Sequence, residues 1–157
     1  MNQTNADASV KADRDALLQR VRASFDKQGA MHTLGASLGE VAPGRVSIGM
    51  SHRAELTQQH GYLHAGMVAT ALDSACGYAA FSLMPADAAV LTIEFKINLI
   101  APAKGPRFRF DGVVTKAGRT ISVVDGRALQ IDDGGAEKLV ATMTATVMTL
   151  LGRGIDS

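Results

Sequence analysis

Two segments of the chain have the residue spacing of a helix. Residues 9–30 carry apolar side chains three or four positions apart, which is typical of an amphipathic surface helix, and Gly29 is its expected C-cap. Residues 64–84 are apolar on every side and rich in alanine and glycine. A helix without a polar face has to be buried. The pattern therefore predicts one surface helix and one core helix whose small side chains let other backbone approach closely.

The segment Leu91–Leu99 has the clearest strand pattern. Its odd positions are apolar and its even positions, including Thr92, are polar. An unbroken alternation places Thr92 on the polar face, away from Leu91 and Ile93. We therefore expect a β-strand with one face on the core and Thr92 on the other.

Five further segments are predicted strands. A hairpin turn at Pro43 and Gly44 is expected to join the first two, and residues 54–63 form a polar loop. The phase of the fifth strand breaks around Gly126, which indicates a β-bulge. The five segments are Thr33–Val41, Arg45–Arg53, Arg107–Lys116, Thr120–Ile131 and Leu139–Leu150.

The order of these elements predicts the fold class. A helix that is apolar all round needs a sheet wrapped around it, and the short connections of the later strands favour antiparallel pairing. We expect an α+β fold in which residues 1–8 are disordered and residues 9–157 form a single domain. About six antiparallel strands wrap around the long central helix, and an extra helix lies at the N-terminus. Open sheet edges favour pairing with a second copy, so a homo-oligomer is expected.

Composition narrows the function classes. The length of 157 residues suits one domain, and the single cysteine, Cys76, excludes an internal disulfide and a four-cysteine zinc site. A formal net charge of +1 argues against a nucleic-acid-binding protein. The polar N-terminal residues predict no secretory signal, and Asp73 within residues 64–84 argues against a membrane span. We expect a soluble, cytoplasmic protein.

Asp73 is the strongest candidate for a catalytic residue. A carboxylate in an apolar helix loses hydration, which tends to raise its pKa, although an Asp paired with a serine or a backbone group, or facing water, is an alternative. Free N–H groups at the helix start, near residues 60–66, form a ready oxyanion site. Asp73 lies nine residues after His64, which puts roughly 10 Å or more between them along the axis. The spacing suggests a site shared by two copies of the chain.

Other candidate residues have plain structural alternatives. His64 and His60 are either bases or helix-capping residues, and no zinc-protease motif surrounds any histidine, so no metal is expected. Cys76 lacks a neighbouring base in sequence and is expected to be an inert core residue. Lys116 and Arg119 flank a predicted turn, where they either contact a phosphate group or face solvent.

Three motifs together resemble the hotdog-fold acyl-CoA thioesterases of the phenylacetate-degradation (PaaI-like) type. They are Gly61-x-x-His64-Ala65-Gly66, LDSACGYAA around Asp73, and LTIEFKINLIAPAKG. The resemblance runs from about Leu34 to Leu150. It implies a hotdog fold, an acyl-CoA substrate, no cofactor, and a homodimer or homotetramer with sites at the subunit interface.

The resemblance also assigns roles to residues. Asp73 corresponds to the nucleophile or general base, the Ala65 amide to the oxyanion donor, and Thr92 to the residue that helps to hold the attacking water. Further motif residues shape the site or bind substrate: Gly61, His64 and Gly66. CoA phosphates are expected near the turn that contains Lys116, Gly118 and Arg119.

Two positions depart from the family pattern. Gln58, or Gln59, stands where the family usually has Asn, and Ala65 replaces the first glycine of a Gly-Gly pair. Gln keeps the amide chemistry with a longer reach, and Ala keeps its N–H. These changes bear on substrate choice and rate more than on the reaction class.

The sequence leaves two other functions open. A hotdog hydratase typically has a histidine five residues after its carboxylate, and this chain has Tyr78 there. A non-catalytic acyl-CoA-binding protein is the alternative from a different class. The low aromatic content does not distinguish an aromatic acyl group from an aliphatic one.

Overall fold

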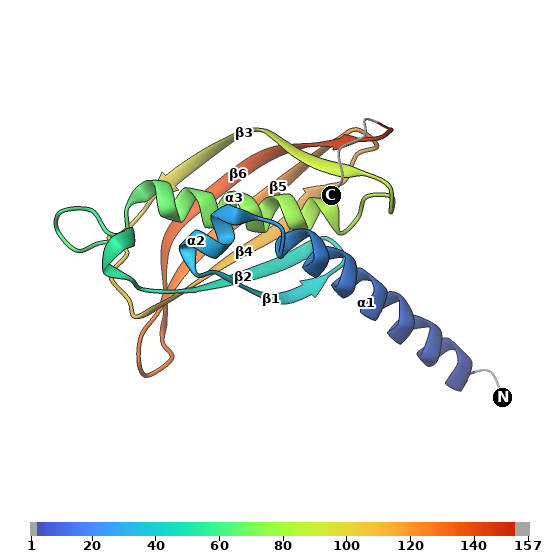
Figure 1. Ribbon diagram of the computed structural model, residues 1–157, viewed down its shortest axis with the longest axis horizontal. Coiled ribbons are helices and arrows are strands. Elements are labelled where there is room, and N and C mark those ends of the chain that lie inside the picture. The colour runs from blue at the N-terminus through green and yellow to red at the C-terminus, as the bar shows by residue number, and fades with distance from the viewer. Residues whose placement is uncertain (1–2, 153–157) are drawn as a thin grey trace.

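The computed structural model describes residues 3–152, with side chains from residue 8, so expectations for residues 1–2 and 153–157 lie outside it. Figure 1 shows the long helix α3 lying against one face of a curved sheet. The helices are α1 (Gln3–Phe25), α2 (Gly29–Leu34), the 3₁₀ helix η1 (Ala54–Leu56) and α3 (Ala65–Phe81). The strands are β1 (Ser37–Ala42), β2 (Arg45–Ser51), β3 (Ala89–Leu99), β4 (Arg107–Lys116), β5 (Ile121–Ile131) and β6 (Glu137–Leu150).

The sheet has six antiparallel strands in the order β1-β2-β4-β5-β6-β3, so β1 and β3 are its edges. Ala71, Leu72 and Ala75 of α3 are fully buried against it. The α+β architecture, a central helix with an antiparallel sheet around it and an extra N-terminal helix, is therefore confirmed. Within residues 3–152, no helix is long and apolar enough to cross a membrane.

Most element boundaries agree with the sequence pattern. β4 has the predicted bounds, and β2, β3, β5 and β6 differ from them by one or two residues at one end. The hairpin between β1 and β2 is also confirmed. Gly44 has a φ of 72° in its turn and donates its N–H to the Ser82 hydroxyl oxygen at 2.7 Å.

The N-terminal region departs from its predicted boundaries. α1 begins at Gln3, so residues 3–8, which we expected to be disordered, are helical, and they contain no proline or glycine to stop a helix. α1 ends at Phe25, and Gly29 begins α2 instead of capping the first helix. α2 ends in turn at Gly35, whose φ of 63° makes it the C-cap. The first strand therefore starts later than predicted.

Arg20 fastens α1 to the C-terminal end of α3. Its guanidinium donates hydrogen bonds to the carbonyl oxygens of Phe81 at 2.8 Å and Met84 at 3.0 Å, and lies 4.7 Å from the centre of the Phe81 ring. Val21 and Phe25 add buried apolar contacts on the same helix. These contacts hold the C-terminal half of α1 on the domain, while its N-terminal half projects away (Figure 1).

Two paired glycines let α3 lie close to the sheet. A Cβ at Gly112 would be 2.4 Å from the carbonyl oxygen of Ala75, and one at Gly126 would be 2.8 Å from Cys76 Sγ. The bulge expected at Gly126 is wrong, because this residue pairs regularly with Gly112 and the register of β5 against β6 shifts only after Ala128. The phase break in the sequence instead marks the close approach of the helix.

β3 contains a bulge that its alternating sequence did not indicate. Thr92 pairs with Val147 and Glu94 pairs with Thr146, which leaves Ile93 as one extra residue. Val147 is fully buried, so Thr92 opposite it lies on the face that α3 covers. The expectation that Thr92 faces away from the core is therefore wrong, because the bulge reverses the phase of the strand.

Replacing Gly112 with alanine is expected to lower the free energy of unfolding by about 1–3 kcal/mol, because the new methyl group has to displace the Ala75 backbone. Gly29→Ala is the control, since a Cβ there meets no atom within 4 Å. Its effect is expected to stay within about 0.5 kcal/mol. Urea denaturation measures both, and equal stability of the two variants would contradict the close packing of α3 on β4.

Candidate active site

The N-terminus of α3 presents one amide that is free to bind a ligand. His64 is the N-cap, with φ −61° and ψ 137°, and its Nδ1 accepts a hydrogen bond from the Gly66 N–H at 2.9 Å. The carbonyl oxygen of His64 accepts from the N–H of Met67 at 2.9 Å and of Val68 at 3.3 Å. Among the residues that the structure describes, the Ala65 N–H has no acceptor. His64 therefore acts as a cap, and Ala65 is left as the donor.

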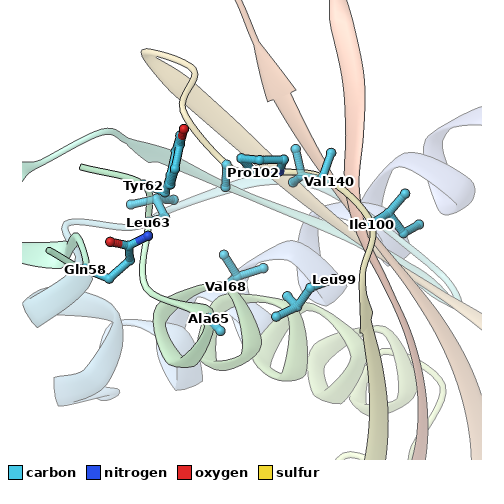
Figure 2. A pocket seen from close by; sticks show the side chains of 11 residues that line it. Gln58, Tyr62, Leu63, Ala65, Val68, Leu99, Ile100, Pro102 and Val140 are labelled. Carbon is cyan, nitrogen blue, oxygen red and sulfur yellow. The ribbon is translucent and has the colours of Figure 1, made fainter. Parts of the chain in front are cut away.

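The loop before α3 holds Gln58 beside this amide. The Gln58 N–H donates to the Tyr62 carbonyl oxygen at 2.9 Å, and Gly61 makes the turn with a φ of 80°. Oε1 of Gln58 accepts the His60 N–H. In Figure 2 the Gln58 nitrogen is the end of the amide nearer the pocket. The loop therefore directs the side-chain NH₂ group of Gln58, a hydrogen-bond donor, toward the pocket at the N-terminus of α3.

A pocket of about 360 Å³ lies at this end of α3. Leu99 and Ile100, at the end of β3, form one wall, and Val68 and Val140 contribute further apolar surface (Figure 2). The polar groups of the lining come mainly from the loop and the helix start. The full lining is Gln58, Tyr62, Leu63, Ala65, Val68, Leu99, Ile100, Ala101, Pro102, Ala103 and Val140.

Asp73 lies in the middle of α3, and its carboxylate faces β3. Thr92 Oγ1 donates a hydrogen bond to Asp73 Oδ1 at 2.8 Å, and the bulge at Ile93 makes this contact possible. Burial raises the pKa of Asp73 above its ordinary value of 3.8, and the hydrogen bond from Thr92 opposes part of that rise. The carboxylate is therefore a stronger base than an exposed aspartate.

Asp73 lines a second pocket, of about 280 Å³, at the other end of β3. Ala65 and Asp73 are eight positions apart on one helix, which corresponds to a rise of ~12 Å. The pocket at Ala65 and the pocket at Asp73 share no lining residue. One chain therefore carries two separate pockets, one at each end of the edge strand. The second pocket is lined by Gln28, Asp73, Ser74, Gly77, Tyr78, Val90, Leu91 and Thr92.

Sequence reasoning missed three polar residues of the Asp73 pocket. Ser74 Oγ donates to Gln28 Oε1 at 3.2 Å, and the Tyr78 hydroxyl lies 3.5 Å from Ser24 Oγ. Ser74 and Tyr78 are four positions apart, on the helix face next to Asp73, so helical spacing was a usable signal for them. Gln28 lies 46 positions away from Ser74, and nothing in its own sequence context indicated the contact.

The candidate phosphate-binding residues lie away from both pockets. Lys116 ends β4, and Gly118 and Arg119 line a hollow beside Ala80 and Leu83 near the C-terminal end of α3. Gly118 has a steric role, since a Cβ there would be 2.1 Å from the Ile121 carbonyl oxygen. Within one chain, the structure does not bring this turn together with Ala65 or Gln58.

The remaining site candidates have structural contacts. The Gly66 N–H is donated to the cap, and the Gly61 carbonyl oxygen lies 3.2 Å from His52 Nε2. Cys76 is fully buried, and burial raises its pKa to about 12. Over residues 3–152, no group of three or more His, Cys, Asp or Glu side chains is arranged to hold a metal ion.

Asp73→Asn is expected to stabilise the protein at neutral pH. Because folding raises the pKa of Asp73, the ionised carboxylate lowers stability above its folded pKa, and this cost disappears below its unfolded pKa, near 3.8. The difference in Tm between variant and wild type should therefore be small below about pH 4 and grow as the pH rises toward 7. Thermal melts across this range measure it. A difference that does not depend on pH would contradict the raised pKa.

Comparison with known proteins identifies the family. The model of the thioesterase superfamily matches residues 60–137, which include Ala65, Asp73 and Thr92. The crystal structure of a thioesterase family protein from Silicibacter pomeroyi is 55% identical and covers 87% of this chain and 99% of its own, with a TM-score of 0.84.

Two more distant structures show the same fold. The E. coli PaaI protein from the phenylacetic acid degradation operon is 18% identical over 85% of this chain and 93% of its own, with a TM-score of 0.75. A phenylacetic acid degradation-related protein from Ralstonia eutropha JMP134 is 24% identical over 84% of this chain and 98% of its own, with a TM-score of 0.73. These likenesses confirm the expected hotdog fold. The 55% identity to the Silicibacter protein, over 99% of that protein's chain, shows that this chain belongs to the thioesterase superfamily, and its fold is similar to that of PaaI.

Proposed function

We propose that this thioesterase hydrolyses acyl-CoA to the free acid and CoA, at sites that two copies of the chain build together. The observation that carries the proposal is the half-buried Asp73 carboxylate, which accepts a hydrogen bond from Thr92 in the pocket between α3 and β3. The second component of the proposed site is a hydrogen-bond donor for the thioester carbonyl oxygen. This donor is the free Ala65 N–H at the N-terminus of α3, with Gln58 beside it.

The two parts supply the chemistry that a thioester requires. The Ala65 N–H donates to the thioester carbonyl oxygen and stabilises the oxyanion of the tetrahedral intermediate. Asp73 either removes a proton from water, which then attacks the carbonyl carbon, or attacks that carbon itself to give an anhydride that water cleaves. Collapse of the intermediate breaks the C–S bond, and the CoA thiolate leaves. The thiolate takes up the proton that the attacking water loses. The products are the carboxylic acid and CoA.

The exposed edge of β3 is the surface on which a second copy is expected to pair. β3 is bonded on one side only, to β6. An unpaired strand edge with apolar side chains favours association with another strand. Among the described residues, five exposed large apolar side chains belong to β3 or follow directly after it: Leu91, Ile93, Phe95, Leu99 and Ile100.

A two-fold axis through the middle of β3 would bring the Ala65 pocket of one copy next to the Asp73 pocket of the other copy. When two identical strands pair antiparallel about Phe95, the Leu99 end of one lies opposite the Leu91 end of the other. Leu99 lines the Ala65 pocket and Leu91 lines the Asp73 pocket. Each dimer would thus combine Ala65 of one copy with Asp73 of the other, twice. Two such dimers would form the alternative homotetramer.

The same pairing gives the basic turn a role. Leu91 pairs with Met148, which pairs with Ile121 directly after the turn that holds Lys116 and Arg119. The turn is therefore at the Leu91 end of the sheet, and two strands inward correspond to ~10 Å. A CoA molecule that leaves the shared site toward this end would bring its phosphates near both cations. This supports the assignment of these two residues and Gly118 to CoA binding.

Ala65→Pro is expected to lower kcat for acyl-CoA hydrolysis by roughly 10²–10³-fold, the typical effect of losing one oxyanion donor. Proline removes only the N–H of the first helical residue, a position that it favours, and the extended His64 before it suits proline. Ala65→Gly is the control, since it keeps the N–H and should keep activity. Release of CoA thiol measures both variants without background from buried Cys76. Full activity of Ala65→Pro would remove Ala65 from the mechanism.

Asp73→Asn and Ala65→Pro are each expected to lose nearly all activity, and a refolded equal mixture of the two should recover about one quarter of wild-type activity. Half of the dimers in such a mixture are mixed, and each mixed dimer has one intact site out of two. Released CoA thiol is again the measurement. Asp87→Asn makes the same substitution at an exposed aspartate and is the matched control for Asp73→Asn. A mixture as inactive as its parents would contradict the shared site. Wild-type protein that binds acyl-CoA without hydrolysing it would instead favour a binding protein.

A further inference from the structure

The Asp73 pocket contains polar side chains that the proposed hydrolysis does not use. Asp73 and Thr92 are the hydrogen-bonded pair of the proposed reaction, Val90 and Leu91 supply apolar lining, and the further polar groups belong to Gln28, Ser74 and Tyr78. Resting on the function proposed above, we propose that these last three residues bind a hydroxyl or similar hydrogen-bonding group at the end of a short acyl chain. Short acyl-CoA esters with such a polar end would be preferred over plain alkyl esters of the same length.

The three residues form one connected cluster. Ser74 Oγ donates to Gln28 Oε1 at 3.2 Å, and Tyr78 contacts Ser24 through its hydroxyl group at 3.5 Å. Tyr78 is only 2% exposed, and hydrogen bonds from Ser24 and Gln28 oppose the rise in its pKa that burial causes. A linked set of side chains of this kind is held in one arrangement, which is a condition for recognising a polar group.

The cluster has hydrogen-bonding capacity left for a ligand. A glutamine side chain has two N–H donors and two acceptor lone pairs on its oxygen, and a serine hydroxyl has two lone pairs. The contacts of Gln28 and Ser74 use only part of this capacity. A ligand hydroxyl can both donate to and accept from such groups. An alkyl end would cover these groups without offering them a hydrogen-bond partner, which disfavours it.

The size of the pocket limits the acyl group to a short one. About 280 Å³ lies just below the usual range for ligand pockets, roughly 300–1,000 Å³. Gly77 leaves the middle open, since a Cβ there meets no atom within 4 Å. The chain of the acyl group thus has room between Gly77 and Leu91 and ends at Gln28.

Gln28 lies between α1 and α2, outside residues 60–137, which the thioesterase superfamily model matches. The contact of Arg20 with the end of α3 holds this N-terminal region in place. The inferred specificity therefore depends on the N-terminal helices α1 and α2 as well as on α3 and the sheet.

The first test compares kcat/KM for matched pairs of CoA esters, hexanoyl against 6-hydroxyhexanoyl and octanoyl against 8-hydroxyoctanoyl. Wild-type protein is expected to prefer one or both hydroxylated esters by about tenfold. Gln28→Met has nearly the same shape without the amide, and Ser74→Ala removes the neighbouring hydroxyl. Each variant should shrink the preference toward one. Gln19→Met, on the exposed face of α1, is the matched control and should keep it.

The second test separates this inference from the proposed function. Calorimetry measures how Asp73→Asn protein, with and without Gln28→Met, binds non-hydrolysable thioether analogues of the same pairs. Tighter binding of the hydroxylated analogue, lost with Gln28→Met, supports the inference even if no ester is hydrolysed, an outcome that would overturn only the proposed function. Equal treatment of both members of each pair by wild-type protein, or an equal loss for both in Gln28→Met, overturns the inference and leaves the hydrolysis standing.

Discussion

The close contact of α3 with β4 and β5 determines the rest of the structure. Gly112 and Gly126 have no side chain to hold the helix away, and the Ala75 carbonyl group and Cys76 occupy the space where Cβ atoms would be. The helix can neither rotate nor rise without losing this fit, because packed protein interiors deform little. Its rotation in turn decides which side chains face the sheet and which face the open edge at β3.

The rotation of α3 sets the direction of the Asp73 side chain and, through its burial, its raised pKa. With Ala71, Leu72 and Ala75 turned toward the sheet, the carboxylate two positions before Ala75 points to β3, where a bulge has turned Thr92 to meet it. The hydrogen bond holds the carboxylate in one position, and the surrounding apolar groups raise its pKa. Catalytic residues commonly show this combination of partial burial and one specific partner.

The edge strand β3 links the two halves of the proposed chemistry. Its first residues border the Asp73 pocket and its last residues border the Ala65 pocket, while its exposed apolar side chains favour a second copy. The geometry of α3 alone keeps the oxyanion donor and the carboxylate of one chain apart, because a straight helix cannot bring residues eight positions apart together. In the proposed dimer, association and catalysis therefore depend on the same strand.

Local features of the sequence determined the elements and the main candidates. An all-round apolar helix, alternating strands and a carboxylate within the helix are visible in residue order alone, and they indicated the α+β fold and Asp73. The role of the Ala65 amide came from the resemblance to hotdog thioesterases. The direction of Thr92, the packing role of Gly126 and the place of Gln28 in the Asp73 pocket depended on the tertiary structure. Each of these depends on pairing or contact with residues far along the chain: the bulge exists only against Val147, Gly126 is explained by Cys76, and Gln28 meets Ser74 across 46 positions. Periodicity reports the environment of neighbouring residues, and long-range contacts are set when the whole domain packs.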